Sequence, residues 1–225
     1  FIPIYLNSLF FLYKNNMHSY LKKFQEVAQS IEIELNKKST LKEKLLKLSR
    51  DLVKTSGKVI SNVHSKRVTE AKKLLSSAIS LHSQICDLVT QDPSFTDSGY
   101  ILAALQEFTE AHIFFSLISD SPIQSPTELG VTDQAYLLGI ADVIGEIRRH
   151  ILEILIDDNI KEAKRFFQLM KDLYDIFLQI EIDKSLISDF RRKRDMARVL
   201  IEKTLSYLFI AIQSKKLEMK MKDFN

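Results

Sequence analysis

The chain has 225 residues, of which 45% are hydrophobic, and its formal net charge is only +3. This apolar content is ample for a folded core and excludes a disordered chain. With five Gly and four Pro, the sequence has few helix breakers, which favours long helices joined by short connections. A mild positive charge by itself indicates no partner, so the positions of the charges have to be considered.

Cysteine content and hydropathy restrict the location of the protein. Cys86 is the only cysteine, which excludes an intramolecular disulfide and a cysteine-based metal cluster. The natural interpretation is a reducing, cytoplasmic location. The sequence contains no stretch of about 20 uncharged apolar residues, so we expect neither a membrane-spanning helix nor a membrane partner.

The first sixteen residues differ in character from the rest. Phe1–Tyr13 is an apolar run of about the length of a signal sequence, but it lacks a basic start and a small-residue cleavage site. Met17 is followed by a segment that resembles an ordinary translation start. We therefore divide the chain into an N-terminal apolar extension, residues 1–16, and one domain, residues 17–225. Two interpretations of the extension stay open: a segment translated from upstream, or a genuine packing segment.

Apolar residues recur at helical spacing along most of the domain. The expected helices are Met17–Asn36, Thr40–Val63, Leu74–Leu88, Tyr100–Ser119, Tyr136–Asp157, Glu162–Glu181 and Phe190–Met221. Thr40 with Glu43 fits a capping box for the second helix, and Thr132 can cap the fifth. Asp120–Asp133 is the clearest loop. Because no segment shows sustained alternation, we predict an all-α, single-domain fold of about seven helices, a helical bundle or α-α superhelix.

Two of these helices carry pairs of acids. Glu107 and Glu110 are three residues apart, and Asp142 and Glu146 are four apart, so each pair lies on one helix face. If the helices face each other, the carboxylates would offer the oxygen ligands that Mg²⁺ or Mn²⁺ prefers. Acid pairs on a solvated surface are common, but these helices are mostly apolar, and charges that face a core are uncommon without a role.

Other chemistries fit the sequence less well. A di-iron centre needs Glu-x-x-His on two helices, whereas the residue three after Glu107 is Glu110. His150, four residues after Glu146, is a candidate accessory ligand. There is no Gly-rich phosphate loop and no Ser–His–acid motif. The remaining histidines are interpreted as ordinary surface or satisfied positions: His18, His64, His82 and His112.

Basic residues form stripes at helical spacing on two helices: one stripe is Arg50, Lys54 and Lys58, and the other is Arg191, Arg194 and Arg198. Arg148 and Arg149 follow Glu146 by two and three residues. Such stripes suit a phosphate backbone. With 32 Lys and Arg against 29 Asp and Glu, however, many basic residues are solvated helix faces. Eight are candidates for nucleic-acid contact: Arg50, Lys54, Lys58, Arg148, Arg149, Arg191, Arg194 and Arg198.

Four motifs, in this order, resemble the translin/TRAX family: Lys47–Asp51, Leu105–Ala111, Tyr136–Glu146 and Phe190–Asp195. The resemblance is closer to TRAX, translin-associated factor X, because translin lacks most of the carboxylates. It implies seven helices and hollow oligomers, typically octamers, that enclose single-stranded RNA or DNA. It also implies a magnesium-dependent endoribonuclease whose catalytic acids correspond to Glu107, Glu110, Asp142 and Glu146. The short loop Asp120–Asp133 resembles a compact prokaryotic form.

The sequence thus predicts an endoribonuclease that uses Mg²⁺ or Mn²⁺ to cleave single-stranded RNA within a hollow homo-oligomer, an octamer by the resemblance. A metal held by the four acids would activate water and leave a 5′-phosphate and a 3′-hydroxyl. Leu169–Ile180 and Leu200–Phe209 are candidate subunit contacts. Two alternatives stay open: a non-catalytic scaffold of translin type that binds single-stranded RNA or DNA, and a structural helical partner whose acids are incidental.

Overall fold

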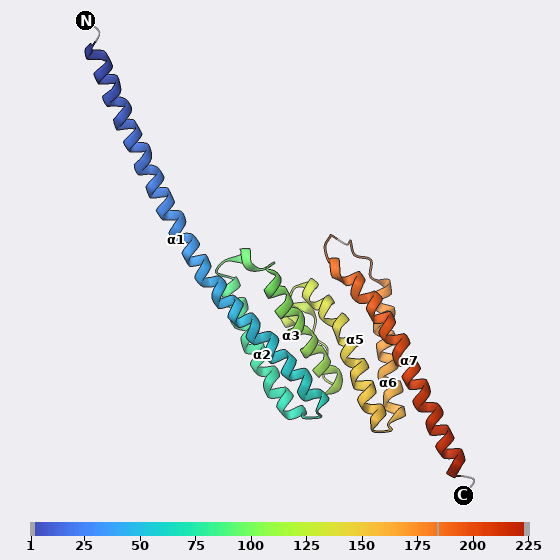
Figure 1. Ribbon diagram of the computed structural model, residues 1–225. Coiled ribbons are helices and arrows are strands. Elements are labelled where there is room, and N and C mark those ends of the chain that lie inside the picture. Colours follow the sequence, from blue (N-terminus) through green and yellow to red (C-terminus); the bar gives the residue numbers. More distant parts are fainter. Residues whose placement is uncertain (1–2, 184, 223–225) are drawn as a thin grey trace. The chain divides into compact units, whose positions relative to one another are not determined.

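The computed structural model describes residues 3–183 and 185–222. These residues form helices and turns without a strand, which confirms the all-α prediction (Figure 1). The elements are α1 (Pro3–His64), α2 (Val68–Val89), the 3₁₀ turn η1 (Pro93–Phe95), α3 (Gly99–Ile118), α4 (Pro126–Leu129), α5 (Asp133–Ile156), α6 (Ile160–Gln179) and α7 (Ser188–Lys222). The side chains of residues 1–16, the expected extension, lie outside the described part.

The chain divides into two compact units, Phe1–Leu45 and Leu46–Asn225. The first is the N-terminal part of α1. In the second unit, α5 is the central helix: it packs against α3 on one side and against α6 and α7 on the other (Figure 1). Every candidate site residue from the sequence belongs to this second unit, so the site can be described within it.

The helix α3 forms much of the core because it is apolar nearly all round. Twelve of its twenty residues are buried, among them Phe108 and Phe114. Its length and composition would also suit a membrane-spanning helix, but 67% of its most apolar window is buried inside the protein. Burial on all sides is expected for an apolar core helix. Glu107 and Glu110 therefore lie on a helix that contributes little to the surface.

A glycine sets the distance between α3 and α5. A Cβ atom at Gly139 would lie 2.7 Å from Thr109 Cβ and 2.8 Å from the Gln106 carbonyl oxygen, closer than real Cβ contacts allow. Thr109 is fully buried and its hydroxyl donates a hydrogen bond to the Leu105 carbonyl oxygen, so it has little room to move. The two helices thus cross in near backbone contact, one turn away from Asp142.

One expected helix boundary is wrong. Thr40 lies inside α1, where its hydroxyl donates to the Asn36 carbonyl oxygen at 3.0 Å instead of capping a new helix. Hydroxyl residues in a helix interior satisfy themselves in this way when nothing interrupts the backbone ladder. The structure has a capping box at Ser125 and Glu128, which opens the short α4 inside the expected loop. The Thr132 cap is confirmed, with its hydroxyl oxygen 3.2 Å from the Ala135 N–H.

We expect Gly139→Ala to destabilise the protein by about 2–3 kcal/mol, because the added methyl group forces α3 and α5 apart in a tightly packed region. Thermal unfolding would then begin roughly 5–10 °C lower. Gly145→Ala is the matched control, since its added Cβ would have no described residue within 4 Å apart from its own helix backbone and chain neighbours. It should be neutral or stabilising by up to about 1 kcal/mol. Equal losses in both variants would contradict a steric role for Gly139.

Candidate metal centre

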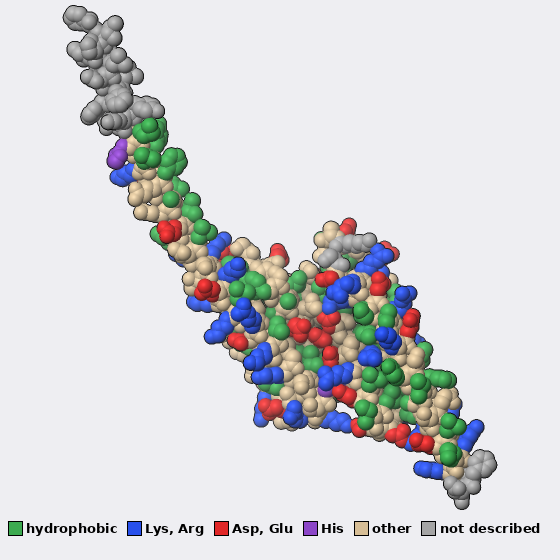
Figure 2. Space-filling model, viewed as in Figure 1, with side chains coloured by type: hydrophobic (Ala, Val, Ile, Leu, Met, Phe, Trp, Pro, Cys, Tyr) green, Lys and Arg blue, Asp and Glu red, His purple; other side chains and the backbone are tan. Residues whose placement is uncertain are grey.

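The four acids predicted from the sequence lie in one pocket of about 620 Å³. Glu107 and Glu110 come from α3, and Asp142 and Glu146 come from α5. Figure 2 shows Asp and Glu side chains gathered in the middle of the face, where α3 and α5 lie in Figure 1. The face of α3 that carries the first acid pair therefore meets the face of α5 that carries the second, as the sequence analysis expected. The remaining lining residues are Gly57, Ile60 and Ser61 of α1, Gln106 of α3, Arg149 of α5 and Lys193 of α7.

Asp142 is held by contacts from two other helices. The Gln106 side-chain amide of α3 donates to Asp142 Oδ2 at 2.6 Å, and the Lys193 ammonium of α7 forms an ion pair with Oδ1. The Lys193 side chain is only 15% exposed, so this pair is largely shielded from water. Sequence reasoning missed Lys193 because it lies off the arginine stripe of its helix. Its position inside the motif Phe190–Asp195 was the signal that could have indicated it.

Glu146 is held by His64, at the C-terminal end of α1. His64 Nε2 lies 2.6 Å from Glu146 Oε2, and Nδ1 lies 2.8 Å from Glu153 Oε2. The His64 side chain is 2% exposed, so the interpretation of this histidine as an ordinary surface or satisfied position understates its role. It connects α1 to α5 through two carboxylates. Its sequence context gave no indication of this, because its partners are 82 and 89 residues away.

Glu107 and Glu110 differ from the α5 acids in their surroundings. Among the described residues, neither has a hydrogen-bond partner for its carboxylate. Burial, followed by the charges of Asp142, Glu107 and Glu146, raises the pKa of Glu110 to about 9. Burial and the charge of Asp142 also raise the pKa of Glu107. Carboxylates crowded in this way repel one another, and a divalent cation among them would remove that repulsion.

The two arginines that follow the acids point to different places. Arg149 lines the acidic pocket, and its Nε lies 3.3 Å from Glu153 Oε1. The Arg148 guanidinium lies instead 6.0 Å from the centre of the Tyr207 ring of α7. The structure therefore brings only Arg149 to the acids. His150, the candidate accessory ligand, does not line the acidic pocket; its ring centre lies 6.4 Å from that of His64.

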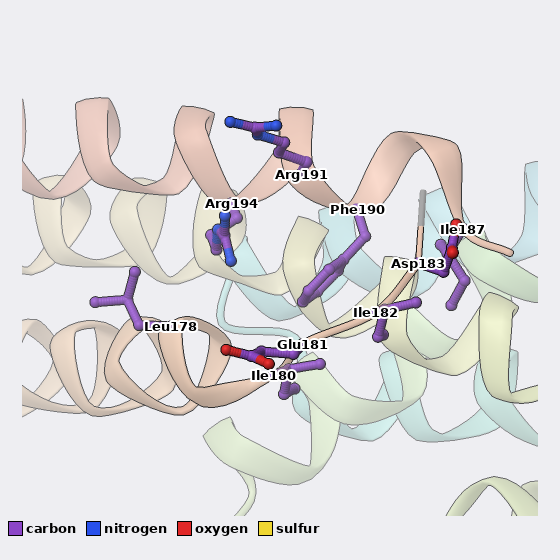
Figure 3. A pocket seen from close by; sticks show the side chains of 9 residues that line it. All are labelled: Leu178, Ile180, Glu181, Ile182, Asp183, Ile187, Phe190, Arg191 and Arg194. Carbon is purple, nitrogen blue, oxygen red and sulfur yellow. The ribbon is translucent and has the colours of Figure 1, made fainter. Parts of the chain in front are cut away.

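The other basic candidates lie outside the acidic pocket. Arg50 and Lys54 line a separate, mostly apolar pocket of about 340 Å³ beside Tyr100 of α3. Arg191 and Arg194 line a pocket of about 550 Å³ near the turn between α6 and α7. In Figure 3 the Arg194 side chain points towards α6, whereas Arg191 points away from it. The two remaining candidates, Lys58 and Arg198, are exposed.

Burial of Glu110 and the charges of the neighbouring carboxylates predict that the stability of the metal-free protein, kept in chelator, depends on pH. The unfolded chain releases the Glu110 proton near pH 4.5, whereas the folded protein holds it to about pH 9. Between these values the unfolded state binds fewer protons, so this group's contribution to stability falls as pH rises. By linkage this contribution falls by about 1.4 kcal/mol for each pH unit above 4.5, and so by at most about 5 kcal/mol at pH 8.5. We expect Glu110→Gln to raise the unfolding temperature by at least about 4 °C at pH 8.5 and by little at pH 5.

The control for this measurement is Glu70→Gln, which removes an exposed carboxylate of α2 that pairs with Lys73. It should leave the unfolding temperature unchanged at both pH values. A Glu110→Gln protein whose gain in unfolding temperature is the same at pH 5 and pH 8.5 would show that ionisation of Glu110 is not the cause.

Comparison with known proteins agrees with this architecture. The Translin family matches residues 40–205 of the chain. An uncharacterized protein of Methanocaldococcus jannaschii is 33% identical over 189 residues, 84% of either chain. The crystal structure of apo-NeC3PO has a TM-score of 0.75 at 29% identity, covering 81% of this chain and 96% of that one. The AfC3PO–duplex RNA complex has a TM-score of 0.74 at 30% identity, covering 83% and 96%. The chain belongs to the Translin family.

Proposed function

We propose that this protein is a TRAX-like subunit that cleaves RNA in a reaction dependent on Mg²⁺ or Mn²⁺. The observation that carries the proposal is the convergence of Glu107, Glu110, Asp142 and Glu146 on one pocket. Like charges are costly to bury together, and a fold that collects four of them beside one lysine is best explained by a cation. A divalent ion with oxygen ligands fits this donor set.

Each residue of the pocket has a role in this proposal. Glu107 and Glu110, whose carboxylates have no other partner among the described residues, would hold the ion together with Asp142 and Glu146. The bound ion would supply Lewis-acid activation of water and neutralise charge on the scissile phosphate. Lys193 would orient Asp142 through their ion pair. Arg149, exposed at the pocket, would position a phosphate of the RNA.

The proposed substrate is RNA. A solved relative, AfC3PO, forms a complex with duplex RNA. We propose single-stranded RNA as the cleaved form, because an extended strand can bring one phosphodiester into the acidic pocket, and single-stranded DNA as a possible ligand. The basic residues outside the pocket would hold neighbouring phosphates by charge, independently of sequence.

The proposed assembly is a homo-oligomer, an octamer by the family resemblance. Apolar side chains gather along α7 in Figure 2. Leu205, Tyr207 and Phe209 are each at least half exposed in the single chain, and all three lie in the expected contact segment Leu200–Phe209. Ile176 and Leu178 are exposed in the other segment, Leu169–Ile180. Apolar surfaces of this extent are typical of subunit interfaces. On the cysteine content we place the assembly in the cytoplasm.

The second candidate is a non-catalytic scaffold of translin type. The complex of AfC3PO with duplex RNA favours the scaffold, because it demonstrates binding of RNA by a relative. The ion pair between Lys193 and Asp142 is compatible with it as well, because a lysine can partly neutralise the acids without a metal. The two candidates differ in one measurable property, which is cleavage of bound RNA on addition of Mg²⁺.

We expect Glu107→Gln and Asp142→Asn each to reduce Mg²⁺-dependent cleavage of labelled single-stranded RNA at least about 100-fold, because each removes a charged oxygen ligand of the ion. RNA affinity should change by less than about threefold, since no phosphate contact is lost. Glu70→Gln is the control and should cleave at the wild-type rate.

Wild-type protein that binds single-stranded or duplex RNA but cleaves neither, with Mg²⁺ or Mn²⁺ present, would establish the scaffold instead. Cleavage that survives both substitutions would place the reaction elsewhere in the molecule. If the protein neither binds nor cleaves RNA, both candidates are excluded, and the alternative that remains is a structural helical partner whose acids are incidental.

The stripe on α1 predicts a salt dependence of RNA binding. The double substitution of Arg50 and Lys54 by Gln removes two phosphate contacts, so the slope of log affinity against log salt should become shallower by about 1.4–1.8. Lys73→Gln is the matched control, because Lys73 is an exposed lysine of α2 outside the stripes. An unchanged slope in the double variant, measured by fluorescence anisotropy between low and moderate salt, would exclude this stripe from the RNA interface.

A further inference from the structure

A cluster of two histidines and a glutamate lies behind the acidic pocket and has no role in the proposed reaction. His64 comes from the end of α1, and His150 and Glu153 come from α5. One ligand atom from each residue lies within 4.8 Å of the others. The His64 side chain is 2% exposed and that of Glu153 is 30% exposed, so the cluster is shielded but reachable from solvent.

The ligand types in this cluster differ from those of the acidic pocket. Two imidazole nitrogens and one carboxylate oxygen suit Zn²⁺ or Co²⁺, whereas the all-oxygen set of the acidic pocket suits Mg²⁺. Three protein ligands leave a fourth position for water, as in open zinc sites. Ions of different chemical class would therefore be sorted between the two neighbouring groups.

The contacts of His64 support a cation in this position. Metal-bound histidines usually donate their other ring N–H to a carboxylate, and His64 Nε2 lies 2.6 Å from Glu146 Oε2 in that arrangement. If Nε2 carries the proton of a neutral ring, Nδ1 presents a lone pair to Glu153 Oε2 at 2.8 Å. Two lone pairs at that distance repel each other unless a positive charge lies between them.

Binding an ion in this cluster requires two of the three ligands to move. A tetrahedral ion about 2.0–2.1 Å from nitrogen and oxygen ligands holds those ligands about 3.3 Å apart. The Glu153 carboxylate would need to withdraw by about half an ångström, and it is 30% exposed on one side. The His150 nitrogen, which lies within 4.8 Å of the other two ligand atoms, would approach them by up to about 1.5 Å through rotation of its ring, which packs edge-on against Phe166 at 4.6 Å. The His64 ring, whose centre lies 4.9 Å from that of Phe114, stays in place.

Other charges face the cluster as well. Arg149 Nε lies 3.3 Å from Glu153 Oε1, which leaves Oε2 as the oxygen directed at His64. Glu162 and Arg165 of α6 pair with each other beside His150, so their charges largely offset. Glu146, which contacts His64, thus adds a negative charge next to the cluster, and this charge favours a bound cation.

We propose that His64, His150 and Glu153 form a second cation site, specific for a borderline ion such as Zn²⁺ or Co²⁺. The ion joins the end of α1 to α5 and, through the hydrogen bond between His64 and Glu146, fixes one wall of the acidic pocket. The site itself is independent of RNA cleavage; only its influence on Glu146 rests on the proposed function. His64 is in this sense a positioning residue.

The test uses the full chain, stripped with chelator, and Co²⁺ alone as the probe. Titration should produce the intense visible absorption of tetrahedral, nitrogen-ligated Co²⁺, and one equivalent of Zn²⁺ should abolish it. His150→Ala and Glu153→Gln should each weaken the apparent affinity at least about 100-fold. Glu107→Gln, in the acidic pocket, and Glu162→Gln, next to His150, are the controls and should retain the signal.

Circular dichroism of each variant verifies that it remains folded, and the conservative Glu153→Asp should restore part of the signal. A wild-type protein without this absorption would show that a proton alone separates His64 from Glu153, and would overturn the proposal. A signal that survives His150→Ala, or that disappears in Glu107→Gln, would also overturn it, since the ion would then lie elsewhere. No RNA is present, so a failed cleavage assay leaves this result unaffected.

Discussion

The close crossing of α3 and α5 at Gly139 is the constraint on which the site depends. An added Cβ there would overlap Thr109 and the backbone of Gln106, so only glycine permits this approach. Because the crossing lies one turn before Asp142, it brings that acid within hydrogen-bond distance of the Gln106 side chain. Gly139 lowers the intrinsic stability of its own helix, but it allows the acidic faces of α3 and α5 to lie close together.

Clustering the four acids is unfavourable when no cation is bound, because the carboxylates repel one another. Contacts from other side chains offset this repulsion for only some of the acids. Asp142 has a lysine and an amide, and Glu146 has a histidine. Glu110, 8% exposed, has no hydrogen-bond partner among the described residues, and burial with the charges of the other acids raises its pKa to about 9. A bound cation would neutralise the remaining negative charge of this pocket and would stabilise the folded protein.

Two residues near helix ends that are distant in the sequence hold the acids of this pocket. His64 ends α1 and contacts Glu146, and Lys193, in the second turn of α7, contacts Asp142. The His64 side chain is almost completely buried and that of Lys193 is largely shielded from water, which strengthens their hydrogen bonds to the carboxylates. The acids of α5 are therefore oriented by elements before and after the helix pair that carries them, and any change in the packing of α1 or α7 is transmitted to the pocket.

Much of the fold could be predicted because its signals are local. Helical spacing of apolar residues predicted the long helices from α3 onwards to within three residues, whereas α2 begins six residues before the expected Leu74. The Thr132 cap was correct. The expected break at Thr40 failed for a local reason too: a threonine can satisfy its hydroxyl inside a helix as well as at its start. The pairing of acids on one face also follows from spacing alone.

The sequence by itself thus determined that the chain is helical and that Glu107 with Glu110, and Asp142 with Glu146, share a face. Only the tertiary structure decided that these faces meet, that Lys193 and His64 join them, and that Arg148 turns away towards Tyr207. The physical reason is the range of the signal. Helical periodicity relates residues three or four apart, whereas the contacts of Asp142 and Glu146 span 36 to 82 residues and depend on how closely helices cross.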